Sequence, residues 1–227
     1  MENSQVQAPA SSRRSKSTSP EVSIGDRLRA IRFERKLTLQ AASKLCGVGL
    51  STLSKIETGQ AAPAYGTLKR IAEGLELSFE ELISGDRPEA TSARRTITRE
   101  RQVLKFKSSR YDYRVHASDL ANKAMVPLEM EIRARGLPNP SDWSQHDGEE
   151  FIFVLEGEIE VRLSDYAPFR LKQGQSAYID SRMRHAFVAC SPGPARMLSI
   201  CYDPKHKQRT AEEFIDASLP SRRSARG

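Results

Sequence analysis

The sequence contains few cysteines and no long apolar run. Its three cysteines, Cys46, Cys190 and Cys201, are far from any Cys-x-x-Cys spacing. An odd and sparse set of this kind fits core thiols in a reducing compartment. No stretch of about eighteen apolar residues is present, so we expect no membrane-spanning helix. Residues 1–20 are polar and lack the apolar stretch of a secretory signal peptide. We therefore expect a cytoplasmic protein.

The charge of the 227-residue chain is unevenly distributed. The formal net charge is +7, and residues 87–110 carry eight basic and two acidic side chains, a net charge of +6. The basic residues in and around this segment's centre are Arg94, Arg95, Arg99, Arg101, Lys105, Lys107 and Arg110. A basic segment between two nearly neutral regions suits a polyanion such as DNA. A solvated linker explains the same charge equally well.

The apolar pattern changes along the chain and divides it into two domains. Residues 1–20 predict a disordered basic tail, and residues 21–86 predict a helical domain. Residues 87–100 are polar and basic, contain Pro88 and predict a linker. Residues 101–205 predict a β domain, and residues 206–227 a C-terminal tail. The expected fold class is multidomain: an α domain followed by an all-β domain.

Five helices are predicted in the first domain. Ile24, Leu28 and Ile31 share one helical face, and Ser23 can cap it. The next helices are expected after Thr38, from about Leu50 to Thr58, after Pro63, and from the capping box that starts at Ser78. Gly47 suits a sharp turn between the second and third helices. Two short helices joined by a glycine turn and held by three others predict a helix-turn-helix domain.

Short strand-like runs follow residue 101. They are Val103–Phe106, Tyr111–Val115, Met125–Ile132, Phe151–Leu155, Ile159–Leu163, Ala177–Ile179, Ala186–Ala189 and Met197–Tyr202. Turn residues separate them, among them Asp147–Gly148 and Asp165–Pro168. Many short strands with regular turns predict an all-β barrel or sandwich.

The first domain resembles a known DNA-binding family. The segment GVGLSTLSKIETGQAAPAYGTLKRIA is similar to the helix-turn-helix of Cro/C1-type, or xenobiotic-response-element, regulators, and the resemblance covers about residues 22–86. It implies that Leu50, Ser51 and Lys55 face bases in the major groove. It places further residues near the DNA backbone, namely Thr38, Gln40, Thr52 and Ser54. It also implies that Arg32 and Glu57 form a structural ion pair.

The second domain resembles the cupins, which are double-stranded β-helix barrels. WSQHDGEEFIFVLEGEIEV is similar to the first cupin motif and GQSAYIDSRMRHAFVA to the second. Metal-binding cupins use two histidines at i and i+2, a glutamate and a later histidine. The matching positions here are His146, Glu150 and His185, whereas Ser144 stands at the first histidine position.

The resemblance therefore implies a site for one divalent transition metal inside the barrel. The alternative is a metal-free barrel whose polar groups hydrogen-bond to one another or to an organic ligand. We expect Ser144, Tyr178 and Phe187 to line an effector pocket. Trp143 is a further candidate, and core packing is an equally good explanation for each aromatic residue.

The two resemblances together favour a regulator over an enzyme. We expect a sequence-specific DNA-binding transcription factor whose cupin domain binds a small-molecule effector and changes its affinity for a double-stranded operator. A single helix-turn-helix reads half a site, so a homodimer is expected. The alternative is a cupin metalloenzyme, a dioxygenase or isomerase, with an accessory DNA-binding domain. A DNA-binding antitoxin is a third hypothesis, but it does not explain the complete β domain.

Overall fold

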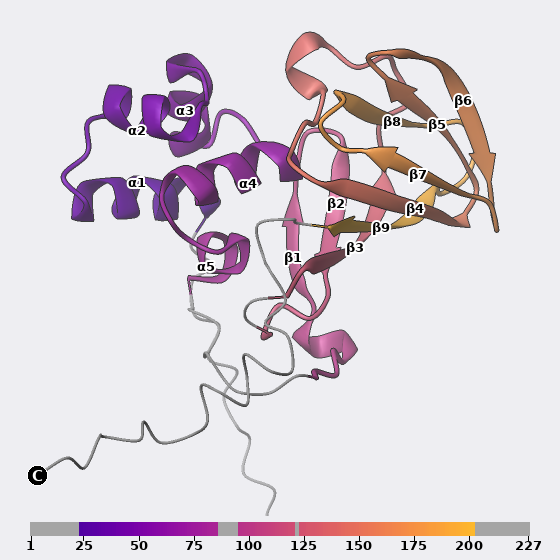
Figure 1. The fold of residues 1–227 in the computed structure, drawn as a ribbon, viewed down its shortest axis with the longest axis horizontal. Coiled ribbons are helices and arrows are strands. Elements are labelled where there is room, and N and C mark those ends of the chain that lie inside the picture. Colours follow the sequence, from indigo (N-terminus) through magenta and orange to yellow (C-terminus); the bar gives the residue numbers. More distant parts are fainter. Residues whose placement is uncertain (1–22, 86–94, 121–122, 203–227) are drawn as a thin grey trace, which may run out of the picture.

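The computed structural model describes residues 23–85, 95–120 and 123–202. The expected tails, and with them Arg94 of the basic segment, lie outside these residues. The described part contains five α-helices followed by nine strands, as expected for an α domain joined to an all-β domain (Figure 1). None of its helices has both the length and the apolar character needed to cross a membrane.

The helices begin where the capping residues predict. They are α1 (Ile24–Glu34), α2 (Leu39–Cys46), α3 (Leu50–Glu57), α4 (Tyr65–Gly74) and α5 (Phe79–Ser84). Ser23 and Thr38 accept hydrogen bonds from the first turns of α1 and α2, and Ser78 and Glu81 form a capping box. Gly47 adopts a left-handed conformation between α2 and α3. These local signals are confirmed because each depends on residues only a few positions apart.

One buried ion pair ties the first helix to the third. Arg32 Nε and Glu57 Oε1 lie 2.7 Å apart, and a second guanidinium nitrogen of Arg32 lies 2.8 Å from the other carboxylate oxygen. The pair packs beside the helical core that includes Leu28, Leu53 and Ile56. The implied structural role of Arg32 and Glu57 is therefore confirmed.

The strands form two antiparallel sheets that enclose one apolar core. The six-stranded sheet has the order β1 (Leu104–Lys107), β2 (Tyr111–Val115), β3 (Met125–Ile132), β9 (Arg196–Tyr202), β4 (Glu149–Glu156), β7 (Ser176–Asp180). The three-stranded sheet has the order β6 (Tyr166–Lys172), β5 (Glu158–Leu163), β8 (His185–Ala189). The fully buried side chains of Ile152, Val154 and Ile159 lie between the sheets. Two short 3-10 helices, Glu100–Gln102 and Pro140–Asp142, complete the domain.

Strand β6 corrects one expectation. Asp165–Pro168 is predicted as a turn, but the turn covers only residues 164–165, and Pro168 lies within β6. Proline fits here because, among the described strands, β6 is the edge of its sheet and pairs only with β5, so the missing N–H interrupts no second ladder. The register with β5 also shifts between Val161 and Leu163, next to this proline.

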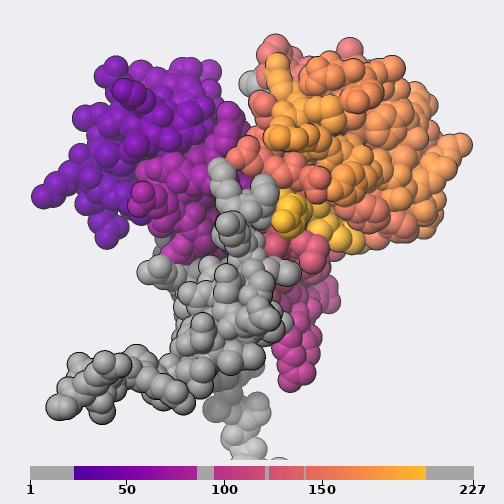
Figure 2. All heavy atoms as spheres, viewed as in Figure 1, coloured from indigo at the N-terminus to yellow at the C-terminus, as the bar shows by residue number. Residues whose placement is uncertain are grey.

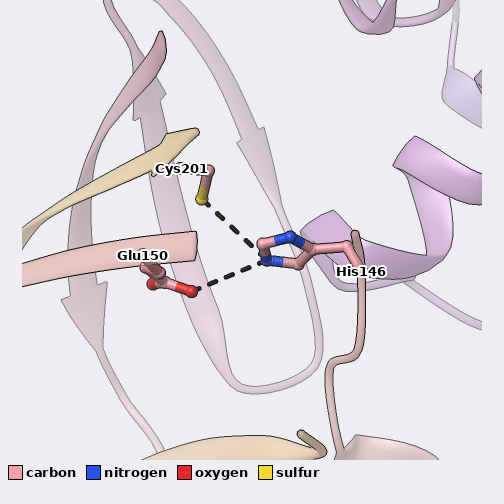
Figure 3. Close-up of side chains that lie close together, drawn as sticks. All are labelled: His146, Glu150 and Cys201. Carbon is pink, nitrogen blue, oxygen red and sulfur yellow. Dashed lines mark hydrogen bonds and ion pairs between the residues drawn. The ribbon is translucent and has the colours of Figure 1, made fainter. Parts of the chain in front are cut away.

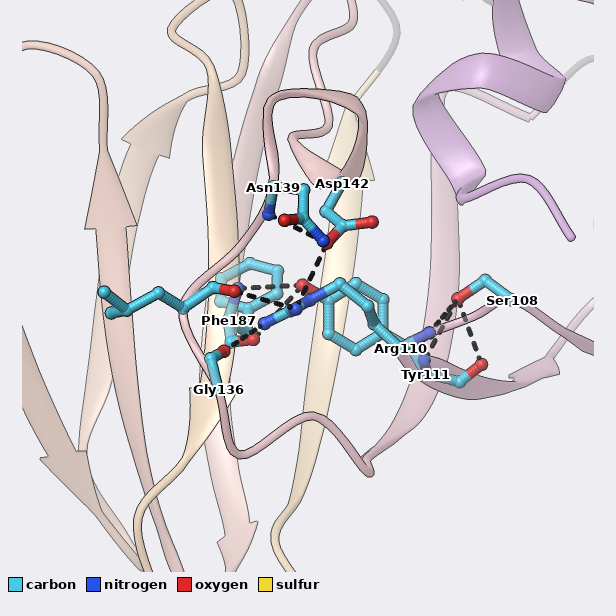
Figure 4. A network of polar contacts seen from close by, with 8 residues as sticks. Ser108, Arg110, Tyr111, Gly136, Asn139, Asp142 and Phe187 are labelled. Atoms are coloured by element: carbon cyan, nitrogen blue, oxygen red, sulfur yellow. Dashed lines mark hydrogen bonds and ion pairs between the residues drawn. The ribbon is translucent and has the colours of Figure 1, made fainter. Parts of the chain in front are cut away.

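Arg110 does not belong to an exposed basic segment. Its side chain is buried, and its guanidinium lies 3.3 Å from Asp142 Oδ2 and 2.8 Å from the carbonyl oxygen of Gly136 (Figure 4). Beside it, the hydroxyl of Tyr111 accepts a 2.9 Å hydrogen bond from the N–H of Phe187. Arg110 therefore fits neither a polyanion-binding segment nor a solvated linker, because this arginine holds the Pro140–Asp142 turn to the barrel. Arg95, Arg99, Arg101 and Lys105 remain exposed.

The helical domain packs against one end of the barrel. Helix α4 lies between the other helices and the strands, and its first turn reaches the barrel (Figure 1). The space-filling view shows the two domains in contact along this side (Figure 2). The contact places α4 beside Ser144, Gln145 and His146 of the first cupin motif.

Candidate metal centre and DNA-contact surface

A small cavity lies inside the barrel where α4 meets it. Its lining is formed by Tyr65, Tyr111, Tyr113, Leu128, Met130, Ser144, His146, Glu150, His185, Phe187, Ser199 and Cys201. The volume of the cavity is about 10 Å³. That is close to the minimum needed for one water molecule, so the cavity has room for a water or a single ion.

Three different segments bring the motif residues together. Glu150 lies on β4 and points inward with Ile152 and Val154. His185 is the first residue of β8 and pairs with Ser144 through two 2.9 Å backbone hydrogen bonds. His146 precedes β4 instead of lying on a strand, because the chain turns at Gly148, where φ is +97°. Both histidines lie near Glu150, and His146 reaches it from a loop.

Both imidazoles turn the same ring nitrogen toward Glu150. His146 Nε2 lies 3.6 Å and His185 Nε2 lies 3.4 Å from Glu150 Oε2. The opposite nitrogens, Nδ1, lie 3.2 Å from the carbonyl oxygen of Asp147 and 2.9 Å from that of Met183. Since a carbonyl oxygen only accepts, Nδ1 carries the hydrogen in each ring. Nε2 is then the ring atom that remains for a metal ion, as in metal-ligating histidines; without a metal, a proton on Nε2 is donated to the carboxylate of Glu150.

The carboxylate of Glu150 is held ionised despite being almost fully buried. Its exposed fraction is 2%. Burial alone would raise the pKa of Glu150, but the side-chain contact with His146, the nearby imidazoles and the hydroxyl of Ser199 together lower it. Burial lowers the pKa of His185, which favours its neutral form. An ionised carboxylate beside a neutral imidazole is the protonation state that binds a metal ion.

The donor types fit a first-row divalent metal, and each histidine lies near Glu150 at a suitable distance. Two donors that bind one ion at about 2.1 Å lie about 3.0–3.4 Å apart in octahedral or tetrahedral geometry. The distances from Glu150 Oε2 to Nε2 of His146 and of His185 are close to this range, at 3.6 Å and 3.4 Å. Ligand atoms of His146, Glu150 and Cys201 all lie within 4.8 Å of one another (Figure 3), and His185 is not part of this group, although its Nε2 faces Glu150. Burial raises the pKa of the Cys201 thiol well above its usual value. The thiol is therefore a weaker donor than His185 unless a metal displaces its proton.

The expected pocket residues divide into two groups. Ser144 and Phe187 line the cavity as expected. Tyr178 does not: it is 64% exposed, because it pairs with Phe151 on the outer face of the sheet while its neighbour Ile179 points inward. Trp143 lies outside the cavity lining and packs against the guanidinium of Arg184 at 5.6 Å.

Sequence reasoning missed five polar residues of the cavity, namely Tyr65, Tyr111, Tyr113, Ser199 and Cys201. Ser199 and Cys201 alternate with apolar residues on β9, and their inward position was signalled by two polar side chains at i and i+2 in a buried strand. Tyr65 comes from α4 in the other domain. No local pattern distinguishes Tyr65 from an ordinary helical core residue.

The residues expected to face DNA are accessible on the helical domain. Leu50 is 48% exposed, and Ser51 and Lys55 are exposed on the same short helix, α3, whose opposite face buries Leu53 and Ile56. Among the residues expected near the DNA backbone, Thr38, Gln40 and Thr52 are exposed and Ser54 is partly buried. Thr38 already uses its hydroxyl to cap α2.

Comparison with known proteins supports both domains. Residues 23–83 match a helix-turn-helix domain family, and residues 130–201 match the cupin domain family. The HTH-type transcriptional regulator PuuR of Escherichia coli is 27% identical over 175 residues, which cover 77% of this chain and 92% of PuuR. An HTH_3 family transcriptional regulator from Vibrio cholerae has a similar structure, with a TM-score of 0.55, 27% identity, and coverage of 81% of this chain and 97% of that one. The (S)-2-hydroxypropylphosphonic acid epoxidase of Streptomyces wedmorensis is 32% identical over 111 residues, 44% of this chain and 54% of the enzyme.

Proposed function

Because this chain joins a helix-turn-helix domain to a C-terminal cupin domain, we propose that it is a DNA-binding transcriptional regulator whose cupin domain binds a small effector. The observation that carries the proposal is the exposed face of α3. An apolar side chain, a hydroxyl and an ammonium group, those of Leu50, Ser51 and Lys55, stand together there. They suit a thymine methyl group, either base of a pair, and guanine O6 and N7, respectively.

The experiment that tests DNA reading uses the full chain and a pool of random duplexes. Selection should enrich one pseudo-palindromic sequence, because a dimer presents two α3 helices. Lys55→Ala should then weaken binding to the selected duplex by about 1–3 kcal/mol and relax preference at one position. Lys172→Ala is the matched control, since Lys172 is exposed on the barrel strand β6. Equal losses on selected and random DNA would remove Lys55 from the residues that read bases.

We further propose that the cupin domain holds one divalent transition metal through His146, Glu150 and His185. The support is the common direction of the two Nε2 atoms toward the carboxylate of Glu150. Three protein ligands leave positions for water or for an oxygen donor of an effector. When bound, the ion would supply Lewis acidity and an anchor for that donor.

We propose that the dimer interface is an exposed apolar face of the barrel. The outer face of β3, β9, β4 and β7 carries Met125, Tyr202, Phe151 and Tyr178, all exposed. The register places Phe151 directly beside Tyr178 and Tyr202 beside Met125. Adjacent exposed apolar side chains on a sheet commonly mark a protein interface. A two-fold contact through this face would pair two copies and their α3 helices.

A metal-dependent enzyme is a second candidate function. It is favoured by the two-histidine, one-carboxylate set, which is typical of non-haem iron oxygenases, and by the partial similarity to the epoxidase. Oxygen uptake by the Fe²⁺-loaded chain with a supplied reductant tests it, with Glu150→Gln as control. Catalytic uptake that the substitution abolishes, in a protein that selects no DNA sequence, would favour the enzyme over the regulator.

A further inference from the structure

One aromatic residue of the helical domain forms part of the wall of the cupin cavity. Tyr65, at the start of α4, lines the cavity, and its ring meets the ring of His146 edge-on with centroids 5.2 Å apart. A side-chain hydrogen bond also joins Tyr65 to Cys201. The lining residues other than Tyr65 belong to the barrel and its loops. The cavity is therefore closed by a residue that belongs to the DNA-binding domain.

The residue after Tyr65 is adapted to this contact. Gly66 has no side chain, and a Cβ at its position would lie 2.5 Å from the hydroxyl of Ser144 and 2.9 Å from the carbonyl oxygen of Gln145. Both atoms belong to the cupin domain. Alanine would stabilise an isolated helix by about 1 kcal/mol relative to glycine. The glycine therefore serves the close approach of α4 to the barrel at the expense of the helix itself.

Further contacts seal the junction around Tyr65. Phe79 of α5 packs on Tyr65 at 4.8 Å and on Phe106 of the barrel at 5.8 Å. Lys123 of the barrel forms a buried ion pair with Glu80 of α5. The N–H of Ser109 donates a 3.3 Å hydrogen bond to the carbonyl oxygen of Ala62. Apolar, ionic and backbone contacts thus hold Tyr65 in place from several sides.

The size of the cavity limits what it can accept in this arrangement. With room for about one water molecule, it admits a metal ion but no organic molecule of several heavy atoms. Most barrel side chains of the lining are fixed on strands by hydrogen-bond ladders, and Ser144 and His146 are held by backbone hydrogen bonds to His185 and Ser181. Tyr65 reaches the cavity only through the docking of the helical domain on the barrel. A larger ligand therefore gains space most readily by displacing Tyr65.

We propose that the cavity is a two-domain binding site in which Tyr65 is the displaceable wall. The docked arrangement has room for a single metal ion. A small organic molecule with a chelating oxygen-donor group displaces Tyr65 and releases α4 from the barrel. The second half of this inference rests on the proposed metal and effector function, whereas the first half rests on the contacts of Tyr65 and Gly66 alone.

Movement of α4 would reach the DNA-contact helix because the helical domain is tightly packed. Leu68 and Ile71 of α4 are fully buried, and a Cβ on Gly74 would lie 2.6 Å from the Cα of Cys46 at the end of α2. Helices packed this closely shift together. Release of α4 thus changes the position of α3 relative to the barrel, and with it the spacing of two α3 helices in a dimer. A ligand with different affinity for the two arrangements shifts their populations.

The first test measures access to the cavity without DNA, metal or effector. Cys201 lines the cavity, so its alkylation by iodoacetamide, followed by mass spectrometry of the full chain, reports opening. Tyr65→Ala should speed this alkylation about tenfold or more, whereas Tyr65→Phe, which keeps the ring, should stay near the wild-type rate. Cys190, which is partly exposed, calibrates the reagent, and Cys46, buried in the helical domain, reports that this domain stays folded.

Gly66→Ala provides an independent variant. It favours α4 but pushes the domain away from Ser144, so it should also expose Cys201 while Cys46 stays protected. If iodoacetamide alkylates Cys46 in Tyr65→Ala, the helical domain of that variant has unfolded. The alkylation of Cys201 in Gly66→Ala then decides whether Tyr65 is a displaceable wall. Unchanged Cys201 alkylation in Gly66→Ala would overturn the displaceable wall. Cysteine alkylation does not depend on DNA binding. This test therefore remains valid even if the protein is not a transcriptional regulator.

The second test asks whether the wall opposes a chelating ligand. Oxalate binding to the Zn²⁺-loaded full chain is measured by calorimetry, and amide hydrogen exchange of α4 is followed with Zn²⁺ alone and with Zn²⁺ and oxalate. Tyr65→Ala should bind oxalate about tenfold more tightly than wild type, because no wall has to move. In wild type, oxalate but not Zn²⁺ alone should speed exchange in α4. The same oxalate affinity in wild type and Tyr65→Ala would overturn the proposal that the ligand releases α4 from the barrel. Oxalate binding to wild type without faster amide exchange in α4 would overturn it as well.

Discussion

The hydroxyl of Ser199 donates a 2.6 Å hydrogen bond to Glu150 Oε1, while Oε2 of the same carboxylate faces the two histidines. The bond crosses from β9 to the neighbouring strand β4, so the direction of the carboxylate is set by the sheet itself. Mutation of a residue that supports a metal ligand in this way typically lowers metal affinity about tenfold to hundredfold.

We expect Ser199→Ala to weaken Co²⁺ binding about tenfold to hundredfold, because the carboxylate of Glu150 loses its fixed orientation. The visible absorption of Co²⁺ during titration measures the affinity. Ser181→Ala is the matched control, since the hydroxyl of Ser181 is also buried but has no hydrogen-bond partner among the described residues. The same affinity in both variants would show that Ser199 does not orient the ligand.

Protein purified without chelator should contain about one divalent metal ion per chain, and His185→Ala should lose most of it. Elemental analysis gives both values. His116→Ala serves as control because His116 lies on the surface near Glu129, 3.7 Å away, outside the cavity. Less than about a tenth of an ion per chain in wild type, unchanged by His185→Ala, would mean that the cavity recognises ligands through hydrogen bonds alone.

Two arginines near the domain junction should differ in effect. Arg110→Ala should reduce the unfolding free energy of the barrel by about 3 kcal/mol, since it leaves Asp142 without its buried partner. Arg95→Ala should leave stability unchanged, and it should reduce the salt dependence of DNA binding if the basic segment contacts phosphates. The fluorescence of Trp143, next to Asp142, follows urea unfolding, and binding at several salt concentrations completes the comparison. An unchanged urea midpoint for Arg110→Ala would contradict its structural role.

Phe151→Lys should convert the dimer into a monomer, because it places a charge in the centre of the exposed apolar face of the six-stranded sheet. Light scattering after size-exclusion chromatography measures the mass. Tyr166→Lys introduces the same charge at an exposed aromatic residue of β6 and should leave the mass unchanged. A dimer that survives Phe151→Lys would exclude this face as the interface.

The elements that sequence analysis located well are those whose signals are local. The caps at Ser23, Thr38 and Ser78 define helix starts within one turn. The strands β2 and β3 begin and end at the predicted residues, because alternating apolar residues and flanking turns fix both ends. The motif spacing likewise identified His146, Glu150 and His185 as neighbours.

The errors have a different physical origin. The inward or outward direction of Tyr178 depends on the register of β7 against β4, which composition does not reveal. Pro168 is compatible with a strand only at a sheet edge, and the position of β6 in its sheet is a property of the whole fold. Tyr65 joins the cavity through docking of one domain on another, a contact between residues far apart in the chain.

The proline in β6 has a consequence for the behaviour of the protein at high concentration. A free sheet edge presents unpaired N–H and carbonyl groups and can recruit a strand from another molecule, the first step toward aggregation. Pro168 removes one donor from the edge strand, and the shifted register beside it interrupts the flat ladder. β6 is therefore a poor template for strand addition by another copy of the chain.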